Sequence, residues 1–241
     1  MGTILHFDVD TFFLAVHAKD ACDESLLGDK RPVALWQYHD IICASAAARA
    51  LGVTKHMTPA QARPLIEPHG GRLLHAYWRE WPGPRIWYGK YHAASRELFA
   101  ALRAALSVAG AGSACLERAS IDECYVDVSA AVDAQVAALE DGQGLEADRI
   151  VAATAIAHRI LAALTASRLQ LRMSVGIAPN KLLAKLASTR AKLIAAPECS
   201  GHGRLLAVSD EEDVAALLSA TRASKLPGLG SKTTKLRHMV A

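Results

Sequence analysis

Hydrophobic and polar residues alternate along two short stretches of the chain, which is the pattern of strands whose two faces differ. In residues 4–10 the alternation places His6, Asp8 and Asp10 on one face. Residues 119–128 form a second alternating run, which is rich in β-branched residues and contains two adjacent acids. The pattern therefore predicts two strands that each carry acidic side chains near one end.

The two adjacent acids, Asp122 and Glu123, need a bent backbone if they are to act together. Successive side chains of a regular strand point to opposite faces, so the two carboxylates reach one site only at a hairpin tip or a bulge. Residues 113–118 predict the incoming strand, residues 119–121 the bend, and residues 124–128 the outgoing strand. We therefore expect a hairpin that presents both acids at its tip.

The rest of the pattern predicts strands that alternate with amphipathic helices. Residues 32–38 and 41–44 are expected to pair as a hairpin, and apolar residues recur at helical spacing over residues 88–108 and 147–165. Further elements are expected as a helix through Phe12, Phe13, Val16 and His17 capped by Asp10 or Thr11, short helices capped by Ser45 and Thr58, a strand at 171–177, a helix after Asn180 that buries Leu182, Leu183 and Leu186, and helices at 214–220 and 233–240.

This order of elements is typical of a ferredoxin-like α+β layer, with the acids at one edge of its sheet. A Gly-rich turn at residues 226–232 lies between the last two expected helices, which indicates a helix-hairpin-helix. The backbone N–H groups of such a turn suit a phosphate without reading sequence, so Gly228, Gly230 and Lys232 are candidate phosphate contacts.

Composition narrows the class of protein. The chain has 241 residues and 51% of them are hydrophobic, enough for one large core or two to three small subdomains. No apolar run approaches the roughly 20 residues of a membrane-spanning helix, so we expect an intracellular protein without a membrane partner. The five cysteines show no C-x-x-C spacing, so neither a disulfide framework nor a zinc site is expected.

Charge is unevenly distributed along the chain. The formal net charge is only +3, but residues 168–241 contain 12 Lys and Arg against 5 Asp and Glu. A basic end indicates a polyanionic partner, although a solvated charged surface explains the same composition. On the helix after Asn180, the spacing of Lys181, Lys185 and Lys192 aligns three amines on one stripe.

The acidic clusters supply the ligands that hard divalent cations prefer. Two such ions need several carboxylate oxygens, and Asp8, Asp122 and Glu123 can provide them. A purely structural role is the weaker interpretation, because buried carboxylates without partners are costly. The sequence therefore predicts a metal-dependent catalytic centre built from the two acidic strands.

Four segments, at residues 8–13, 49–53, 117–123 and 180–187, resemble in order and spacing the motifs of the Y-family translesion DNA polymerases. They read Asp-Val-Asp-Thr-Phe-Phe, Arg-Ala-Leu-Gly-Val, Glu-Arg-Ala-Ser-Ile-Asp-Glu and Asn-Lys-Leu-Leu-Ala-Lys-Leu-Ala. The similarity covers essentially the whole chain, and residues 36–38 together with 117–123 favour the eta branch. It implies a palm at residues 1–13 and 79–205, fingers at 14–78 and a partial thumb at 206–241.

The resemblance implies template-directed DNA synthesis, in which a dNTP is transferred to a primer 3′-hydroxyl, with bypass of UV-type lesions. Asp8, Asp122 and Glu123 would bind two Mg²⁺ ions, with Mn²⁺ as an alternative, and the carbonyl of Val9 would be a further ligand. Primer-template DNA and a dNTP are the implied partners. A sliding clamp is a further expected partner through a C-terminal region beyond this chain, and a nuclear location follows from the eta branch.

The resemblance also assigns residues around the nucleotide. Phe12, Phe13, Arg49, Lys55 and Lys192 would contact the nucleotide, with Phe13 as the steric gate that excludes ribonucleotides. For an isolated Phe such as Phe13, packing in the core is the alternative. Gln37 would lie near the templating base.

The chain departs from the family pattern at the nucleotide site, and two other functions remain as alternatives. Ala46-Ala47 stands where eta-like polymerases have Tyr-Glu, and Lys55 replaces an Arg, which exchanges a bidentate fork for a point charge. The first alternative is a catalytically weakened scaffold that binds DNA. The second is a nucleotidyl cyclase, which uses a similar sheet with paired carboxylates and two metals.

Overall fold

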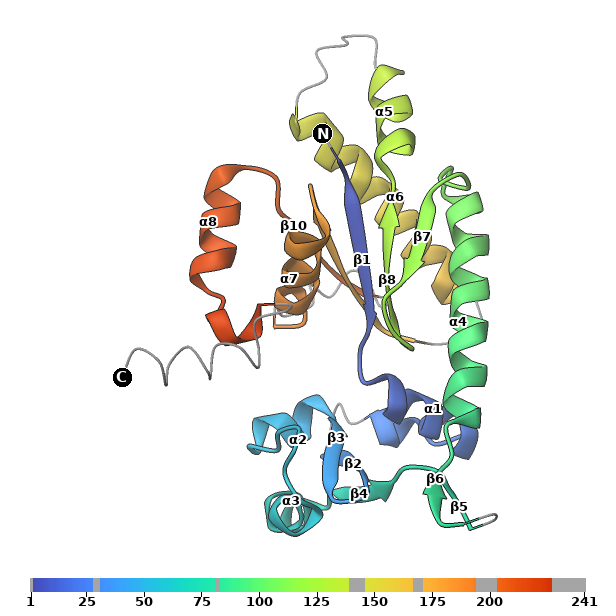
Figure 1. Cartoon of the computed structure of the whole chain (residues 1–241), viewed down its shortest axis with the longest axis vertical. Coiled ribbons are helices and arrows are strands. Elements are labelled where there is room, and N and C mark those ends of the chain that lie inside the picture. The colour runs from blue at the N-terminus through green and yellow to red at the C-terminus, as the bar shows by residue number, and fades with distance from the viewer. Residues whose placement is uncertain are drawn as a thin grey trace. The chain divides into compact units, whose positions relative to one another are not determined.

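The structure, a computed structural model, describes residues 2–27, 31–80, 83–138, 146–166, 171–193 and 203–226. The chain divides into two compact units (Figure 1). Unit 1 comprises Met1–Asp10 and Leu98–Ala241, and unit 2 comprises Thr11–Glu97. The long helix α4 (Gly89–Val108), which confirms the helix expected at residues 88–108, begins in unit 2 and ends in unit 1.

Unit 1 is built on a five-stranded sheet in the order β10-β9-β1-β8-β7. The central strand β1 is antiparallel to both of its neighbours, β8 and β9, whereas β10 is parallel to β9. The succession of strands and helices from β1 to β9 is a split β-α-β arrangement, so the expected α+β class is confirmed. The strands are β1 (Ile4–Val9), β7 (Cys115–Arg118), β8 (Glu123–Asp127), β9 (Met173–Ala178) and β10 (Gly203–Ala207).

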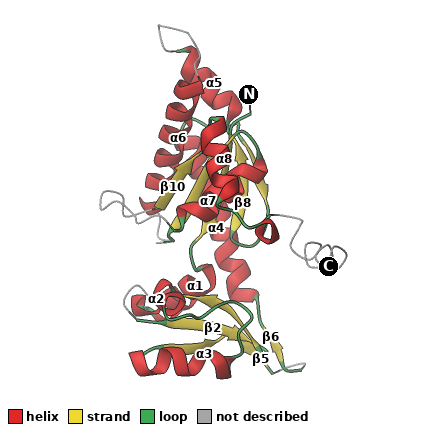
Figure 2. Cartoon of the chain, turned by 90° about the vertical axis from the view of Figure 1, so that its left-hand side faces the viewer, coloured by secondary structure: helices red, strands yellow, loops and turns green. Residues whose placement is uncertain are grey.

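Helices cover both faces of this sheet. Figure 2 shows α6 on one side of the strands and α7 with α8 on the other. The core under α7 and α8 contains buried Leu183, Leu186, Val208 and Leu217. The helices of unit 1 are α5 (Ser129–Ala137), α6 (Glu146–Ala166), α7 (Lys181–Ala191) and α8 (Glu211–Ser219), followed by a 3-10 turn at Ala223–Lys225.

Helix α7 begins as the sequence predicts, but one of its leucines faces outward. The side chain of Asn180 caps the helix by accepting a hydrogen bond from the backbone N–H of Leu183, at 3.0 Å. Leu183 and Leu186 are buried, whereas Leu182 is 43% exposed, so the prediction that Leu182 is buried was wrong. Adjacent helical residues differ by about 100° in direction, and the buried stripe runs through Leu183 and Leu186.

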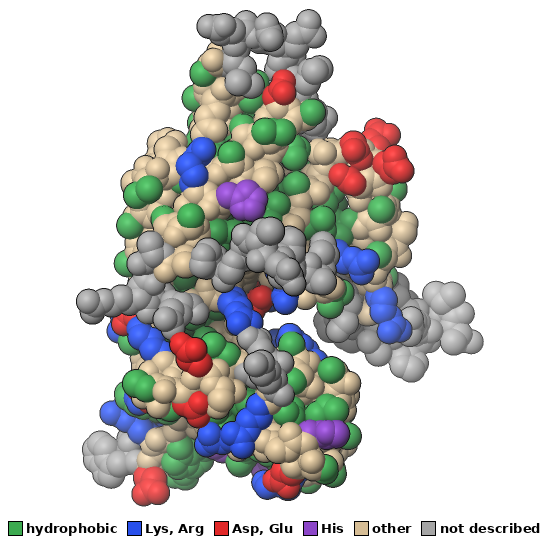
Figure 3. Space-filling model, turned by 180° about the vertical axis from the view of Figure 1, so that it is seen from behind, with side chains coloured by type: hydrophobic (Ala, Val, Ile, Leu, Met, Phe, Trp, Pro, Cys, Tyr) green, Lys and Arg blue, Asp and Glu red, His purple; other side chains and the backbone are tan. Residues whose placement is uncertain are grey.

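The C-terminal part of unit 1 differs from the sequence prediction for identifiable reasons. Helix α8 starts three residues earlier than expected, because Asp210 caps it and an acidic first turn favours a helix N-terminus. Figure 3 shows these acidic side chains at the start of α8. Strand β10 is half-buried and follows no alternating pattern, so periodicity did not predict it. Most of the expected helix-hairpin-helix, residues 227–240, lies outside the described residues.

Unit 2 contains the expected hairpin and the short helices that follow it. Strands β2 and β3 pair antiparallel, and β4 joins them in a three-stranded sheet of order β3-β2-β4. Ser45 and Thr58 cap their helices as predicted. The elements are α1 (Phe12–Ala21), β2 (Val33–Gln37), β3 (Asp40–Ala44), α2 (Ala46–Ala50), α3 (Pro59–Ile66), β4 (Arg72–His75), β5 (Trp78–Arg79) and β6 (Arg85–Ile86), with 3-10 turns at Glu24–Leu27 and Glu67–His69.

The start of α1 contradicts the expected side-chain cap. Thr11 adopts a left-handed conformation, with φ of 51°, and its side chain makes no capping hydrogen bond. Asp10 instead accepts a hydrogen bond from the hydroxyl of Ser174 on β9, at 2.9 Å. The chain therefore turns sharply directly after the acidic strand, at some cost in backbone strain at Thr11.

No helix within the described part of the chain combines the length and the hydrophobicity needed to cross a lipid bilayer.

Gly176 sets how closely α7 packs on the sheet, which generates the first prediction. A Cβ atom at this position would lie 2.0 Å from the carbonyl oxygen of Ala184 and 2.4 Å from the backbone nitrogen of Ser188. Because both are backbone atoms, Gly176→Ala should displace the helix and lower the free energy of unfolding by about 1–3 kcal/mol or more. Urea unfolding at neutral pH measures this change.

Gly112→Ala is the matched control for this experiment. A Cβ atom on Gly112 would meet its nearest neighbour, the Ser107 hydroxyl, at 3.4 Å. The control should therefore change stability by no more than about 0.5 kcal/mol. Equal effects of the two substitutions would show that α7 does not depend on this close approach.

Candidate functional site

The acidic side chains of β1 and β8 meet because of how the two strands pair. In the antiparallel register Asp8 lies directly opposite Glu123. The backbone N–H of Val9 donates to the carbonyl of Asp122 at 3.1 Å, which fixes the start of β8 beside the end of β1. The structure thus brings together the three acids predicted as catalytic, together with Val9.

The turn between β7 and β8 has the predicted form of a hairpin tip. The backbone N–H groups of Ala119 and Ser120 both donate to the carbonyl of Glu123, at 3.0 and 3.1 Å. The hydroxyl of Ser120 also donates to Oδ1 of Asp122, at 2.7 Å. Asp122 is therefore held in the turn while Glu123 begins the strand, which is how two adjacent acids reach one site.

Helix α7 and the residue after it bring amines to these acids. The Nζ atom of Lys185 donates to both carboxylate oxygens of Glu123, at 2.7 and 2.9 Å. Lys192 donates to Oδ1 of Asp8 at 2.6 Å, and the first lysine of the stripe, Lys181, pairs with Glu117. The predicted basic stripe is thus an ion-paired stripe whose last two amines compensate the acidic cluster.

Asp10 is held by a different set of partners. Besides the hydroxyl of Ser174, its carboxylate faces the guanidinium of Arg204 at 3.6 Å and the amine of Lys192 at 3.7 Å. Arg204 belongs to β10, the strand that the sequence pattern did not predict. Lys192 therefore links Asp10 to Asp8 across the end of β1.

Burial and like charges shift the ionisation of this site. Burial raises the pKa of Asp122, and the neighbouring carboxylates of Asp8 and Glu123 raise it further, although the Ser120 hydroxyl opposes the shift. Burial opposes the positive charge of Lys185, but the hydrogen bond to Glu123 together with the charge of that carboxylate and its neighbours raises the pKa of Lys185. Burial also lowers the pKa of His6 to about 4, so its ring is neutral at pH 7.

The donor set fits a hard divalent cation in its chemistry. Three carboxylates lie at the junction of β1 and β8, where burial, and after it the charges of Asp8 and Glu123, raise the pKa of Asp122, and a cation bound beside them would relieve the repulsion between these charges. Within the described residues no three His, Cys, Asp or Glu side chains are arranged to hold an ion, and Lys185 and Lys192 occupy carboxylate oxygens of Glu123 and Asp8. These amines must therefore move before an ion can take full coordination.

In unit 2, the two aromatic residues predicted at the nucleotide differ in exposure. The ring of Phe12 is buried, with 1% of the residue exposed, so any nucleotide contact by Phe12 would come from its backbone. Phe13 is half-buried, and its ring meets that of Tyr91 edge to face at 4.8 Å. Phe13 thus combines core packing with partial accessibility.

The polar residues predicted at the nucleotide also lie in unit 2. Arg49 on α2 and Lys55 after it are exposed. Gln37, at the end of β2, accepts a hydrogen bond from the hydroxyl of Tyr88 at 2.6 Å, which fixes its amide. The predicted phosphate contacts Gly228, Gly230 and Lys232 lie outside the described residues.

Sequence reasoning gave no role to several residues of the site. His6 was placed on the same strand face as Asp8, and the lysine spacing placed Lys185 on the basic stripe, so both had a signal in the pattern. Ser174 and Arg204 had none, because β9 and β10 reach Asp10 only through the tertiary structure.

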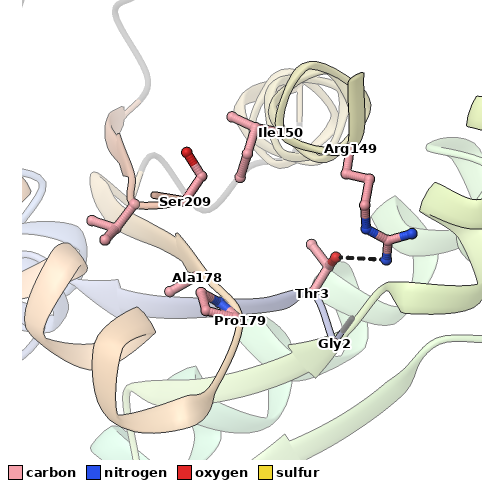
Figure 4. A pocket seen from close by; sticks show the side chains of 8 residues that line it. Gly2, Thr3, Arg149, Ile150, Ala178, Pro179 and Ser209 are labelled. Carbon is pink, nitrogen blue, oxygen red and sulfur yellow. Dashed lines mark hydrogen bonds between the residues drawn. The ribbon is translucent and has the colours of Figure 1, made fainter. Parts of the chain in front are cut away.

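A small pocket lies at the other end of β1, beyond Thr3. The guanidinium of Arg149 donates to the Thr3 hydroxyl at 3.2 Å (Figure 4). It also pairs with Asp133. Since Asp8 is near the opposite end of β1, this pocket is separate from the acidic site. It is lined by Gly2, Thr3, Arg149, Ile150, Ala178, Pro179, Val208 and Ser209.

Clustered carboxylates at the junction of two antiparallel strands, beside a basic helix in an α+β sheet, define a class of site suited to metal ions and phosphates. Comparison with known proteins makes the assignment specific. The profile of the impB/mucB/samB family matches residues 7–189, more than half of the chain. The chain therefore belongs to the impB/mucB/samB family, the Y-family of DNA polymerases.

Curated relatives support this membership. The chain is 31% identical over 239 residues to a DNA polymerase IV of Yersinia enterocolitica, which covers 98% of this chain and 54% of the relative. It is 28% identical to the DNA polymerase IV of Colwellia psychrerythraea, over 95% of this chain and 52% of the relative. It is also 28% identical to the DNA polymerase IV of Oceanobacillus iheyensis, over 96% of this chain and 45% of the relative. The chain spans about half the length of the curated relatives it matches.

These relatives correct two expectations. They carry the name DNA polymerase IV, so the expected similarity to the eta branch is not supported. They also come from bacteria, which have no nucleus, so the expected nuclear location is wrong.

The raised pKa of Asp122 gives the second prediction. Folding disfavours the charged form of this side chain, so its contribution to stability is favourable below the unfolded-state pKa and is lost as pH rises through the folded-state pKa. Asp122→Asn should therefore raise the melting temperature of the metal-free protein at pH 7 by a few degrees. The gain should shrink as pH falls toward about 4. Thermal unfolding in EDTA between pH 4 and 8 measures it.

Asp127→Asn is a control with the opposite sign. Hydrogen bonds from the hydroxyl and backbone N–H of Ser129 lower the pKa of Asp127, so its charge stabilises the fold above the unfolded-state pKa and this contribution is lost at lower pH. The control should lower the melting temperature at pH 7. A loss of stability in Asp122→Asn as well would refute the repulsion inferred for the acidic cluster.

Proposed function

We propose that this chain carries the catalytic part of a template-directed DNA polymerase, which transfers a nucleotide from a dNTP to a primer 3′-hydroxyl. The observation that carries the proposal is the strand register that sets Asp8 opposite Glu123, with Asp122 in the adjoining turn. Family membership and the name of the relatives, DNA polymerase IV, support the same activity.

Asp8, Asp122 and Glu123 are proposed to hold two Mg²⁺ ions, or Mn²⁺, with the carbonyl of Val9 as a further ligand. When bound, such ions stabilise charge on the entering and leaving oxygens of an in-line displacement. The protein's own contribution is to present these three carboxylates at the junction of β1 and β8. A neutral amide in place of any of them would be a poor ligand for these hard cations.

Lys185 and Lys192 are proposed to balance this negative charge until substrate and ions arrive. Lys192 donates to Asp8, so release of that bond frees its amine for the triphosphate of the incoming nucleotide. An ammonium is a mobile point charge on a flexible stem, which suits such an exchange of partners. Lys185 would in the same way release the oxygens of Glu123.

The other residues that the family resemblance assigns to the nucleotide are proposed to bind it as well. Arg49 and Lys55 are exposed cations suited to the triphosphate, and the half-buried ring of Phe13 would exclude a ribose 2′-hydroxyl. Phe12 would contribute through its backbone. Gln37, whose amide is fixed by Tyr88, would lie near the templating base.

The proposed division of labour assigns residues 1–13 and 79–205 to a palm, 14–78 to fingers and 206–241 to part of a thumb. Primer-template DNA is the proposed partner, with phosphate contacts from Gly228, Gly230 and Lys232. A sliding clamp that binds through a region beyond this chain belongs to the same proposal. So does the bypass of UV-type lesions.

Two other functions make different predictions in one assay. A scaffold that binds DNA without synthesis is favoured by Ala46-Ala47, because the Tyr side chain expected at the triphosphate is missing there. Such a scaffold would not extend a primer. A nucleotidyl cyclase would form a cyclic product from a nucleotide without DNA. Primer extension with Mg²⁺ on an undamaged template and on a crosslinked-thymine template separates these functions and tests lesion bypass.

The third prediction concerns Glu123, the acid of β8 that lies opposite Asp8 of β1. Glu123→Gln should reduce primer extension by at least about a hundredfold while leaving the fold intact, because an amide binds a hard cation poorly. Glu117→Gln is the matched control, since Glu117 is an exposed acid on the neighbouring strand β7 whose partner is Lys181. Steady-state extension rates test both. A near wild-type rate for Glu123→Gln would remove this residue from the metal site.

The fourth prediction concerns sugar selection. Phe13→Ala should increase ribonucleotide incorporation by about tenfold or more, because removal of the ring opens space for a 2′-hydroxyl. Tyr38→Ala removes an aromatic side chain that is 53% exposed in the same unit and should leave selection unchanged. The measurement is the ratio of kcat/KM for matched ribo- and deoxyribonucleotides. An unchanged ratio in Phe13→Ala would return Phe13 to a purely structural role.

A further inference from the structure

His6 is a buried histidine whose Nε2 atom faces the acidic site. It lies on β1 two residues before Asp8 and is 0% exposed. Its Nε2 atom is 3.7 Å from Oε2 of Glu123 and has no hydrogen-bond partner within the described residues. Its ring packs against that of Tyr125 at 4.6 Å, and its Nδ1 atom is 2.7 Å from the hydroxyl of Ser188 on α7.

The neighbours of Ser188 decide where the single ring proton of a neutral His6 lies. The Ser188 hydroxyl can donate either to His6 Nδ1 or to the carbonyl of Lys185, at 2.9 Å. That carbonyl already accepts a hydrogen bond from the hydroxyl of Thr189, at 2.9 Å. Donation from Ser188 to His6 therefore leaves both acceptors, the His6 Nδ1 atom and the Lys185 carbonyl, with a hydrogen-bond donor. It also places the ring proton on Nε2.

The opposite tautomer is unfavourable on electrostatic grounds. A bare Nε2 would point its lone pair at the carboxylate of Glu123, from which it is only 3.7 Å away, in a place that solvent does not reach. A buried acceptor without a donor loses the full free energy of its hydration. A protonated Nε2 instead needs only a small approach of Glu123 to become its hydrogen-bond donor.

We propose that His6 is a positioning residue for Glu123, with its Nε2–H directed at the carboxylate and its tautomer fixed by the hydroxyl of Ser188. The inference rests on the proposed function, because it takes Glu123 as a metal ligand. It gives Glu123 a second orienting partner in addition to Lys185. The two partners differ in charge. When the amine of Lys185 leaves, the neutral N–H of His6 still holds the carboxylate without cancelling the charge that a cation needs.

The tautomer can be observed directly. In ¹⁵N NMR spectra of the 241-residue chain without metal at pH 7, His6 should show a protonated Nε2 and an unprotonated Nδ1. Ser188→Ala removes the donor to Nδ1, so this variant should show a mixture of tautomers or the Nδ1–H form. A wild-type His6 with its proton on Nδ1 would overturn the proposal.

Paired substitutions test the positioning role. The side-chain amide nitrogen of Gln reaches about as far as Nε2 of His, and that of Asn about as far as Nδ1. His6→Gln should therefore keep Mn²⁺ binding to the chain within about threefold of the unaltered protein, whereas His6→Asn should weaken it by about 10- to 100-fold, the usual range for residues that orient a metal ligand. Titration calorimetry with Mn²⁺ alone measures binding without any activity.

Controls separate this inference from the proposed function. Thermal unfolding identifies a variant that fails to fold, and Ser188→Ala then replaces His6→Asn as the test, with a smaller loss of Mn²⁺ affinity expected. Glu123→Gln should abolish Mn²⁺ binding. If it does so while His6→Asn and Ser188→Ala bind like the unaltered chain, the role of His6 is refuted and the metal site stands. If Glu123→Gln binds Mn²⁺ normally, the proposed function itself fails.

In primer extension, loss of positioning has a specific kinetic form. His6→Asn should raise the Mg²⁺ concentration at half-maximal rate, whereas the rate at saturating Mg²⁺ should fall much less. His6→Gln should restore the metal dependence of the unaltered chain. A reduced maximal rate with unchanged metal dependence in His6→Asn would indicate a general structural role and would overturn the inference.

Discussion

The burial of Asp122 beside two further carboxylates, those of Asp8 and Glu123, is the constraint on which the rest of the site depends. The pairing of β1 with β8 places the three carboxylates at one junction, where burial, and after it the charges of Asp8 and Glu123, raise the pKa of Asp122. The fold offsets the resulting electrostatic cost with Lys185 and Lys192, which come from outside the two strands. A cluster that is unfavourable without cations has the electrostatic property expected of a metal centre.

The position of α7 follows from the same constraint. The contacts of Lys185 on α7 and of Lys192 directly after it require the helix to lie close to the sheet. Gly176 on β9 permits that approach, because a Cβ atom there would overlap backbone atoms of the helix. The cap at Asn180 sets where the helix begins, and therefore which residues face the acids. One glycine, one cap and the lysine spacing together direct the amines to the carboxylates.

Local patterns predicted the parts of this structure that local forces determine. Alternation and β-branching predicted β1, β8 and the turn between β7 and β8, and capping residues predicted α2, α3 and α7. The contacts of Asp10 could not be predicted, because Ser174 and Arg204 approach it from strands distant in sequence. The left-handed Thr11 was also missed, since a residue that normally caps a helix here forms a strained turn.

The same reasoning explains why motifs identified the family but not its branch. The residues that carried the resemblance, such as Asp8, Arg49 and Glu123, are those proposed to bind ions and phosphates, a chemistry that nucleotidyl transfer requires whatever the branch. The choice of the eta branch depended instead on residues 36–38 and on the length of the run 117–123, which lie in a hairpin and in a turn. Such segments tolerate change because few buried contacts restrain them. Branch assignment therefore depends on similarity along the whole chain, which here leads to relatives named DNA polymerase IV.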